Sequence, residues 1–573
     1  MTATPWSETE GRARRFALIG VAAICCAAIA AWALAGGTIS VRGLADQFAA
    51  NVLYALHVGR YAAAGGDLAA IPSAGLRPLL QVAIVALAVA AALVSLVLAW
   101  MHWSRPKGYG ESRWAVPGDL KRMGLIRRNT GPVLGRYRGR LVQAVESRHA
   151  LVLAPTRRGK TTSYVIPSIL RASGTLVVID PKGELERMTY KARAAKGDCY
   201  VIGWGDPDSP DQWSPTALRV LPKGLHELER HAFRIAAQFF PTGKGGENNY
   251  FQESARRNCA ALVLYECLEG RARGQDPHLG DIVGRVSQLV EKTTGEGQGD
   301  PLGDGLRAIA GEARNKGYPD LIPEALNVLA ATAFKERSSH VNTLVTGLQL
   351  MRTSAVRQST SKASFSWEKL RSEPCTVYLR YPQQDAAAFG PLTALFLETL
   401  FAWALDHPAE RGEQPIHVLA DEFASLPRIP LIQDLLAKGA GQRISISLIL
   451  QDLSQLTAVY GSDIATSMRT NCSYVVAFAQ NNVRTQEELS NLVGKTTRMR
   501  ASYGNKPIWT PSTMDSSVQS RQAEGRPLIL PQEWGELPEE RQVLLVDGHM
   551  TRPVLMDSPR WFRDRGMRRE VTA

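Results

Sequence analysis

Short apolar runs alternate with longer helical stretches along most of the chain. The runs with strand character are Ala150–Leu153, Thr175–Ile179, Tyr200–Ile202, Val377–Leu379, Val418–Ala420, Ile444–Leu450 and Tyr474–Phe478. Because strands that alternate with helices form parallel sheets covered on both faces, this order predicts an α/β fold with a mostly parallel sheet. Between about residues 220 and 345 helical periodicity replaces the strand signals. We therefore expect an all-α insert at 221–345, which divides the α/β domain into 111–220 and 346–558.

Two segments near the C-terminus lack such patterns. Arg498–Glu524 is polar and rich in Ser, Thr and Arg, which predicts an exposed loop. The basic tail at 559–573 interleaves Trp561 and Phe562 with arginines. This composition is compatible with a contact to nucleic acid and equally with a disordered end.

Two longer apolar runs precede the α/β domain. Residues 16–35 carry no charge over the ~20 residues that a membrane-spanning helix needs, and residues 78–103 are also uncharged. Basic residues before the first run also fit a cleaved signal peptide, whose apolar region is usually only ~7–15 residues long. The second run implies that the chain stays in the membrane. We therefore predict a membrane anchor at 1–110, with spans near 16–35 and 78–103.

The orientation of this anchor follows from its basic residues. Arginine and lysine lie close before the first span and after the second, whereas the segment 36–77 holds only Arg42, Arg60 and Arg77. Because basic residues near span ends favour the cytoplasmic side, both termini are predicted to be cytoplasmic and 36–77 to lie outside. The large domain after Arg105 is then in the compartment that contains ATP.

The composition is that of a globular protein with an anionic partner. The 573 residues are 45% hydrophobic and carry a net charge of +13, which favours nucleic acid or phospholipid headgroups, although part of it serves membrane orientation. The seven cysteines form no Cys-x-x-Cys pair and no metal-ligand spacing with histidine. We expect a reducing compartment and no structural zinc.

A phosphate-binding loop follows the apolar run Ala150–Leu153. The residues Ala154, Pro155, Thr156, Arg157, Arg158, Gly159, Lys160, Thr161 and Thr162 match the pattern G-x-x-x-x-G-K-[ST], with Ala154 at the first glycine position. Backbone N–H groups of such a loop wrap the phosphates of ATP, and Thr162–Arg171 is the expected helix. Lys160 is placed to reach the β- and γ-phosphates, and the Thr161 hydroxyl to bind Mg²⁺. A chance match in a basic loop is the alternative that the strand and helix context disfavours.

Polar residues end two further strands. Asp421 and Glu422 follow Val418–Ala420, and a carboxylate at such a strand end can hold the Mg²⁺ shell. Glu422 is then the natural base or orienter for the attacking water. Gln451 ends the strand Ile444–Leu450, where it either senses the γ-phosphate or simply begins the next turn.

Several motifs together resemble the type IV secretion coupling proteins, the ATPases that deliver substrates to conjugative and related channels. They are Val178–Leu185, Asn249–Ala255, Asp421–Phe423, Leu450–Leu456 with Tyr460–Gly461, and Arg526–Pro538. The resemblance runs from the apolar spans to about Pro553. It implies a RecA-like ATPase domain, an all-α domain, a hexameric ring, and ATP hydrolysis with Mg²⁺ that drives substrate transfer.

The resemblance also assigns roles to particular residues. Asp180 and Lys182 are expected near the nucleotide, or else in a structural turn after their strand. In a ring, a neighbouring subunit can supply an arginine finger, for which Arg443 and Lys438 are the candidates. Arg443 is alternatively a surface residue at the start of a strand.

The function predicted is that of an inner-membrane coupling ATPase of a bacterial type IV secretion system. Its expected partners are other secretion components, relaxase–DNA complexes or protein effectors, DNA itself, and further copies of the chain. Two alternatives stay open. A DNA-pumping translocase of the chromosome-segregation kind would usually carry more spans and a terminal DNA-reading module. A scaffold that binds ATP without hydrolysis is disfavoured by the intact Lys160, Thr161, Asp421 and Glu422.

Overall fold

The computed structural model describes residues 41–64, 110–241, 247–293, 300–503 and 519–572, with isolated positions between 78 and 94. The chain divides into two compact units, one of residues 1–109 and 499–524 and one of residues 110–498 and 525–573. The predicted span at 16–35 lies outside the described residues, and the span at 78–103 does so except at those isolated positions. In the first unit, the segment 36–77 is not simply a loop, because it contains helix α2 (Val41–Ala63).

The second unit is built on an eleven-stranded sheet with the order β2-β1-β13-β12-β9-β3-β8-β7-β4-β6-β5. Its strands are β1 (Val133–Tyr137), β2 (Arg140–Gln143), β3 (Ala150–Leu153), β4 (Thr175–Asp180), β5 (Asp198–Gly203), β6 (Cys375–Arg380), β7 (Ile416–Ala420), β8 (Ile444–Leu450), β9 (Tyr474–Ala477), β12 (Arg541–Val546) and β13 (Val554–Asp557). The strands from β9 to β5 in this order are parallel, and β12, β13, β1 and β2 extend them antiparallel. The predicted α/β fold with a mostly parallel sheet is therefore confirmed.

Both faces of the parallel strands are buried, which explains their continuous apolar sequences. In β3, Leu151 and Leu153 belong to one hydrophobic core, and Ala150 and Val152 belong to the other. Because side chains of a strand alternate between faces, each apolar run supplies both cores at once. Helices α5 (Ile166–Arg171), α6 (Glu184–Ala194) and α21 (Arg565–Thr572) contribute to the second core, and α15 (Ala386–Asp406) and α16 (Ile432–Lys438) contribute to the first.

Helix α15 is the one helix, among the described residues, that is long and apolar enough to cross a membrane. However, 78% of its apolar window is buried inside the unit. Its residues Leu392, Phe396 and Phe401 are fully buried in the first core. It is thus a core helix that covers the sheet.

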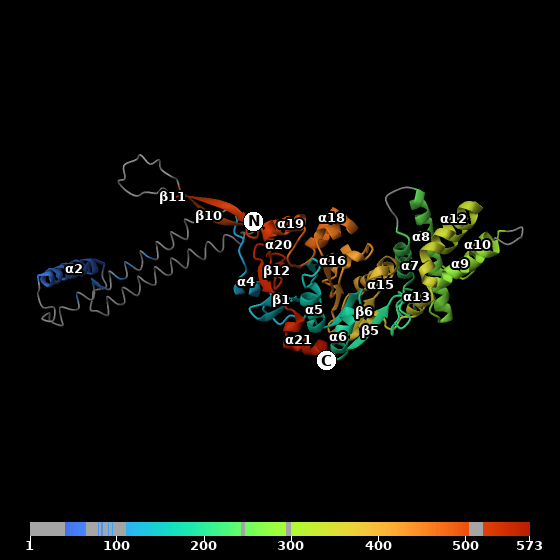
Figure 1. The fold of residues 1–573 in the computed structure, drawn as a ribbon, viewed down its shortest axis with the longest axis horizontal. Coiled ribbons are helices and arrows are strands. Elements are labelled where there is room, and N and C mark those ends of the chain that lie inside the picture. The colour runs from blue at the N-terminus through green and yellow to red at the C-terminus, as the bar shows by residue number, and fades with distance from the viewer. Residues whose placement is uncertain are drawn as a thin grey trace. The chain divides into compact units, whose positions relative to one another are not determined.

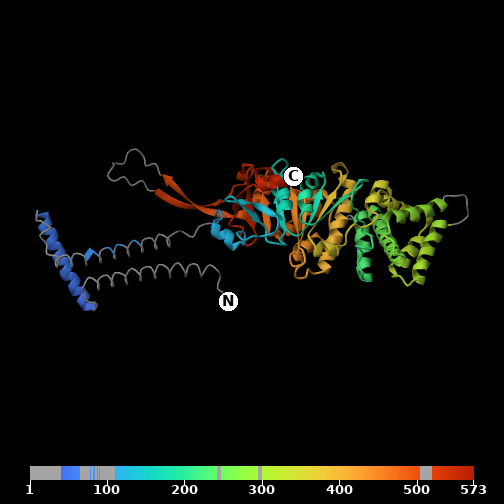
Figure 2. The same cartoon turned by 90° about the horizontal axis from the view of Figure 1, so that it is seen from below.

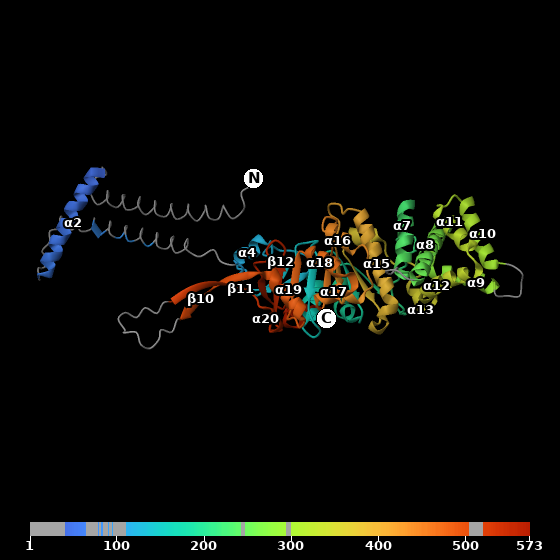
Figure 3. The same ribbon diagram turned by 90° about the horizontal axis from the view of Figure 1, so that it is seen from above.

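The predicted insert is helical throughout its described residues. It contains α7 (Leu225–Phe239), α8 (Glu247–Arg273), α9 (Leu279–Thr293), α10 (Pro301–Asn315), α11 (Leu321–Ala331) and α12 (Phe334–Leu348). Figures 1 and 3 show α8 to α12 gathered into a bundle, with α7 between this bundle and α15. The bundle and the sheet belong to one compact unit and share one continuous core. That it forms a separate domain stays a prediction.

Short helices complete the second unit. They are α4 (Pro117–Arg122), α13 (Ser354–Ser359), α14 (Trp367–Ser372), α17 (Leu453–Tyr460), α18 (Ser462–Thr470), α19 (Val483–Val493) and α20 (Pro531–Gly535). Most of them connect consecutive strands of the sheet, as expected for crossovers between parallel strands.

Two predictions near the C-terminus are wrong in part. Arg498–Glu524 was expected to be a loop, but its ends belong to β10 (Lys495–Tyr503) and β11 (Gln519–Pro527), which form a two-stranded sheet. Polar side chains do not prevent this, because the pairing is made by backbone groups.

The basic tail is not a disordered end. Its residues form α21, and Figures 1 and 2 show the C-terminus against the body of the unit. Met567 is fully buried in the second core, and Arg171 Nη1 lies 2.7 Å from Glu570 Oε1. Asp564 Oδ1 accepts hydrogen bonds from the backbone of Gly566 and Met567 at 3.0 and 3.1 Å, which fixes the start of the helix.

Candidate functional site

The phosphate-binding loop leaves the sheet at the carboxyl end of β3. Ala154 is fully buried in the second core, and its N–H donates to Leu450 O at 2.9 Å. The residues with positive φ are Arg157 (φ 63°) and Gly159 (φ 80°), not Ala154. Alanine therefore replaces the first glycine of the pattern without backbone strain, because left-handed φ angles are needed later in the loop.

The rest of the loop is open to ligands. Pro155, Arg158 and Gly159 are half-buried, and Thr156 and Arg157 are exposed. The Gly159 carbonyl accepts from Ser163 N at 2.8 Å and from Thr162 Oγ1 at 3.1 Å, which begins the helix after the loop. A side chain on Gly159 would meet Thr162 Oγ1 at 3.3 Å, a further reason for glycine there.

A π-helical turn opens this helix. It runs over Thr161–Val165, and the N–H of Ile166 donates to Thr161 O before α5 continues. Such wide turns are rare and frequent at functional sites. Here the turn places Thr161, half-buried, beside Lys160 and points Tyr164 into the sheet.

Lys160 contacts the two acidic residues that follow β7. Its Nζ lies 3.1 Å from Asp421 Oδ1 and 3.5 Å from Glu422 Oε1. The side chains of Lys160 and Asp421 are each 13% exposed, so both charges are largely removed from water. Glu422 holds a left-handed backbone (φ 59°), a conformation that costs energy for a residue with a Cβ and that gathers at functional sites.

Burial has the largest effect on the titration of Asp421. It raises the pKa of Asp421 above its usual range, and the Lys160 charge opposes this effect. Asp421 Oδ1 is buried and contacts Lys160 as an ion pair without a well-aligned hydrogen bond. Because a buried oxygen normally has such a partner, Asp421 keeps an unused acceptor position.

Asp180 lies near this cluster, at the carboxyl end of β4 beside β7. It is buried, and burial raises its pKa to about 6, with a smaller contribution from the charge of Asp421. Asp180 Oδ2 accepts from Glu186 N at 2.8 Å at the start of α6, which is a structural role. Lys182 is exposed, and its charge acts on Asp421.

Gln451 ends β8, the strand that lies between β3 and β7. It is half-buried, its backbone N–H donates to Gln455 Oε1 at 2.9 Å, and no described residue bonds to its side-chain amide. Its strand end therefore lies between the loop that carries Lys160 and the strand that carries Asp421. Next to it, Asp452 caps α17 through Ser454 N at 2.8 Å.

Arg443 lies elsewhere in this chain. It precedes β8, whereas Gln451 follows the strand, so the two are separated by about 25 Å at ~3.3 Å per residue. Its guanidinium lies 2.5 Å from Glu146 Oε1 and donates to Glu413 O at 2.7 Å. Lys438 pairs with Asp434 at 2.7 Å on the surface. A role for either residue at a neighbouring subunit's site stays a prediction.

Residue-by-residue reading of the sequence missed a buried polar chain beneath the site. Tyr164 Oη lies 2.7 Å from Ser447 Oγ, and His417 Nε2 lies 2.9 Å from the same hydroxyl. His417 Nδ1 lies 2.6 Å from Ser445 Oγ, and all four side chains are buried. The signal was present as His417 within an apolar strand and serines at alternate positions of Ile444–Leu450. These hydrogen-bonded side chains join the helix after the phosphate-binding loop to β8 and β7.

Proteins of conjugative DNA transfer resemble this chain in sequence. Residues 113–573 match the family model described as "Type IV secretory system Conjugative DNA transfer". Protein VirD4 of Agrobacterium fabrum is 28% identical over 80% of this chain and 67% of its own length. Conjugal transfer protein TraG of Escherichia coli is 25% identical over 75% of this chain and 71% of its own. The chain thus spans about two thirds of the length of these relatives.

Solved structures show a similar fold. The unbound conjugative coupling protein TrwBdeltaN70 has a TM-score of 0.57, with 18% identity over 79% of this chain and 93% of that one. TrwB in complex with ADP and Mg²⁺ has a TM-score of 0.56, with 18% identity over 79% of this chain and 95% of that one. At this identity the likeness concerns the fold alone.

Proposed function

Because the chain belongs to the type IV secretory system conjugative DNA transfer family, we propose that it hydrolyses ATP to pass substrates to a secretion channel. The membership confirms the predicted family and the predicted role as a type IV secretion coupling protein. The observation that carries the ATPase proposal is the contact of Lys160 with Asp421 and Glu422, at the carboxyl edge of the sheet where β3 and β7 flank β8.

The described oxygen donors fit Mg²⁺. Thr161 supplies a hydroxyl beside the phosphate-binding loop, and Asp421 supplies a buried carboxylate with an unused acceptor position. Hard oxygen ligands of this kind, together with phosphate oxygens, are the usual ligands of Mg²⁺. When bound, the metal would neutralise charge on the phosphates of ATP. The relative TrwB binds ADP with Mg²⁺ in one of its structures, which supports this assignment.

The remaining side chains divide the work of hydrolysis. In our proposal Lys160 neutralises the β- and γ-phosphates and leaves its ion pair with the acids when ATP binds. Glu422 accepts a proton from the attacking water, and Gln451 orients that water or senses the γ-phosphate. Asp180 fixes the start of α6 and keeps the carboxyl end of β4 in place. Two non-glycine residues of the site, Arg157 and Glu422, have left-handed backbone conformations.

The proposed setting of this ATPase follows from its family and from the apolar runs of the sequence. We propose an inner-membrane protein with spans near 16–35 and 78–103, both termini in the cytoplasm, and a working ring of six copies. Its cargo would be relaxase–DNA complexes, protein effectors or both. The support is the family membership and the uncharged runs in the sequence. In such a ring Arg443 or Lys438 would serve the site of a neighbour.

Replacement of Lys160 by Ala tests the proposal. We expect ATP hydrolysis by the full-length protein in detergent to fall by at least about 10²-fold, since the site loses its phosphate-neutralising charge. Transfer by cells that carry the variant should fall with it, while membrane insertion is retained. Lys335→Ala, on the exposed surface of α12, is the matched control and should hydrolyse ATP normally.

Two outcomes would decide against the proposal. Full transfer by Lys160→Ala, with ATP still bound by the wild type, would favour the scaffold that binds ATP without hydrolysis. Transfer that needs no secretion channel, but only double-stranded DNA and ATP, would favour the DNA-pumping translocase.

A further inference from the structure

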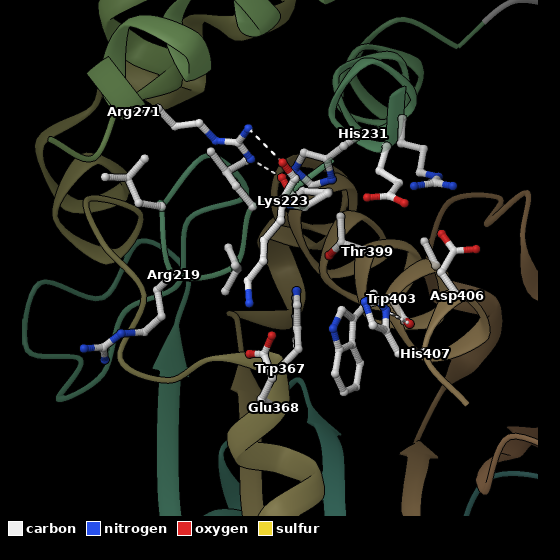
Figure 4. A pocket seen from close by; sticks show the side chains of 17 residues that line it. Arg219, Lys223, His231, Arg271, Trp367, Glu368, Thr399, Trp403, Asp406 and His407 are labelled. Carbon is white, nitrogen blue, oxygen red and sulfur yellow. Dashed lines mark hydrogen bonds between the residues drawn. The ribbon is translucent and has the colours of Figure 1, made fainter. Parts of the chain in front are cut away.

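A cavity of about 830 Å³ lies between the helical bundle and the sheet, and none of its lining residues belongs to the nucleotide site. Its walls come from the segment after β5 and from the helices α7, α8, α14 and α15 (Figure 4). We propose that this cavity binds a short polypeptide segment that carries both acidic and basic side chains. Its volume lies within the ~300–1,000 Å³ of typical ligand sites.

Two opposite charges in the cavity are left for a ligand. Among the described residues, no hydrogen bond or ion pair engages the side chain of Lys223 or of Glu368, and the two do not pair with each other. Figure 4 shows the ammonium of Lys223 reaching into the space above Glu368 and Trp367. Both side chains are exposed, so they are hydrated until a ligand replaces the water.

Four of the other five charged side chains of the lining are already used, and the fifth, Arg234, is half-buried on α7 and therefore less open to a ligand than the exposed Lys223 and Glu368. Arg271 donates to Pro222 O and Lys223 O, and Arg219 donates to Ser364 O at 3.0 Å. Glu227 Oε2 accepts from Gly224 N at 3.1 Å, and Asp406 lies 3.5 Å from Arg230. These bonds hold the walls in place. The recognition is therefore assigned to Lys223 and Glu368.

The aromatic side chains argue against a nucleic acid. Trp403 is stacked with His407 (5.3 Å, 18°) and has the Arg371 guanidinium 6.0 Å from its ring. Trp367 is 3% exposed and packs against Trp213 and Phe396. Base binding needs an open ring face on which to stack, and neither indole provides one.

A mixed-charge peptide fits these constraints. Its carboxylate would pair with Lys223 and its cation with Glu368, and charge-assisted hydrogen bonds of this kind are the stronger ones. The Trp367 N–H, to which no described group is hydrogen-bonded, would be available to a backbone carbonyl. The inference rests on the proposed function in one respect: the peptide would belong to the cargo or to another secretion component.

The test uses the full-length protein in detergent and a fluorescein-labelled peptide of alternating Glu and Lys around one Leu. Fluorescence anisotropy should show saturable binding that Lys223→Glu weakens by at least about tenfold, since two acids then face each other. The double variant Lys223→Glu, Glu368→Lys should regain most of the affinity, because an alternating peptide can shift by one residue. Lys335→Glu, the control for net charge, should bind as the wild type does.

Three results would overturn the inference. They are no saturable peptide binding by the wild type, equal binding by Lys223→Glu, and stronger Lys223-dependent binding of a labelled oligothymidine than of the peptide. Thermal unfolding of each variant shows whether it is folded. ATP hydrolysis is measured on the same samples to test the proposed ATPase separately from the peptide site. Peptide binding can be lost while hydrolysis is intact, and hydrolysis can be lost while peptide binding is intact.

Discussion

Buried charged side chains at the two edges of the parallel sheet differ in their bonding partners. At the carboxyl edge, Lys160 contacts Asp421 and Glu422, but a buried oxygen of Asp421 lacks a well-aligned hydrogen bond. At the amino edge, both Nη atoms of the buried Arg371 donate, to Gln442 O, Arg443 O and Gln414 O at 2.6, 3.1 and 3.3 Å, and its Nε alone has no hydrogen bond.

A second arginine repeats the amino-edge arrangement. Arg193, also buried, donates to Ala172 O and Gly174 O at 3.0 Å each, and its Nε donates to Thr376 Oγ1 at 2.7 Å. These arginines bind carbonyls just before strands begin, and so they tie the loops of that edge together. The comparison indicates that polar groups at one edge stabilise the fold, and that those at the other are kept for a ligand.

The sharpest test of the carboxyl edge is Glu422→Gln. A positioned general base contributes about 10²–10⁴-fold to a rate, so ATP hydrolysis should fall by that factor. Since Gln is of similar size, ATP affinity should change only a few-fold and the unfolding midpoint should hardly move. Steady-state hydrolysis, nucleotide binding by equilibrium dialysis and thermal unfolding measure the three. A large loss of stability would place Glu422 with the structural groups instead.

Arg371→Met tests the amino edge. The variant removes a buried cation and leaves three carbonyls without their donor, and bonds to charged groups are worth about 1.5–3 kcal/mol each at most. We expect a loss of about 3 kcal/mol in stability, seen as a lower midpoint of thermal unfolding. Residual folded protein should hydrolyse ATP with an unchanged KM. The control is Arg357→Met, whose surface pair with Asp281 is worth at most about 1 kcal/mol.

The carboxyl edge was largely predictable from sequence, and the amino edge was not. Lys160, Asp421 and Gln451 follow short apolar runs, and parallel strands bring such ends together. Arg371 and Arg193 carry no local signal, because their partners are carbonyls far along the chain. The cavity around Lys223 escaped prediction for the same reason: its walls come from four separate segments.

Helices and strands, too, were predictable only where their own sequence carries the signal. The strand Ile444–Leu450 was predicted with its observed bounds, since a buried parallel strand is continuously apolar. The ends of Arg498–Glu524 were missed, because a polar two-stranded sheet gives no hydrophobic pattern. The tail helix was missed because its stability depends on the burial of Met567 by distant residues.

The polar chain between the edges gives a pH-dependent prediction. Burial lowers the pKa of His417 to about 3, so the folded protein keeps this imidazole neutral. Below pH 6.5 the unfolded chain binds a proton that the folded one does not, so stability falls as the pH drops. From pH 7 to pH 5 the loss from His417 is about 2 kcal/mol.

His417→Gln should remove this part of the pH dependence. Thermal unfolding at pH 7 and at pH 5 measures it, and the exposed His226→Gln is the control. An equal drop in the unfolding midpoint for wild type and His417→Gln would contradict a neutral, buried role. His149, His231 and His278 are also buried with lowered pKa values of about 4, so some pH dependence remains in the variant.

Tyr164→Phe is the mildest change, and it asks whether the two edges communicate. It deletes one hydroxyl, whose bond to Ser447 at 2.7 Å is worth about 1 kcal/mol of stability. If the hydrogen-bonded side chains Tyr164, Ser447 and His417 only support the core, the unfolding midpoint should fall slightly and ATP hydrolysis should not change. Because Tyr164 lies in the π-helical turn after Lys160, we expect kcat to fall several-fold as well, with KM unchanged.

The readout that separates the two cases is kcat measured well below the unfolding temperature. Tyr190→Phe, which alters an exposed tyrosine on α6, is the control for loss of a hydroxyl. Ser447→Ala should lower kcat at least as much, because it also removes the contact with His417 Nε2, and the double variant should cost little more than Ser447→Ala alone, since both changes remove the Tyr164–Ser447 bond. Additive losses would mean that Tyr164 and Ser447 act independently. The nucleotide edge would then be positioned by its loop and strand ends without this connection.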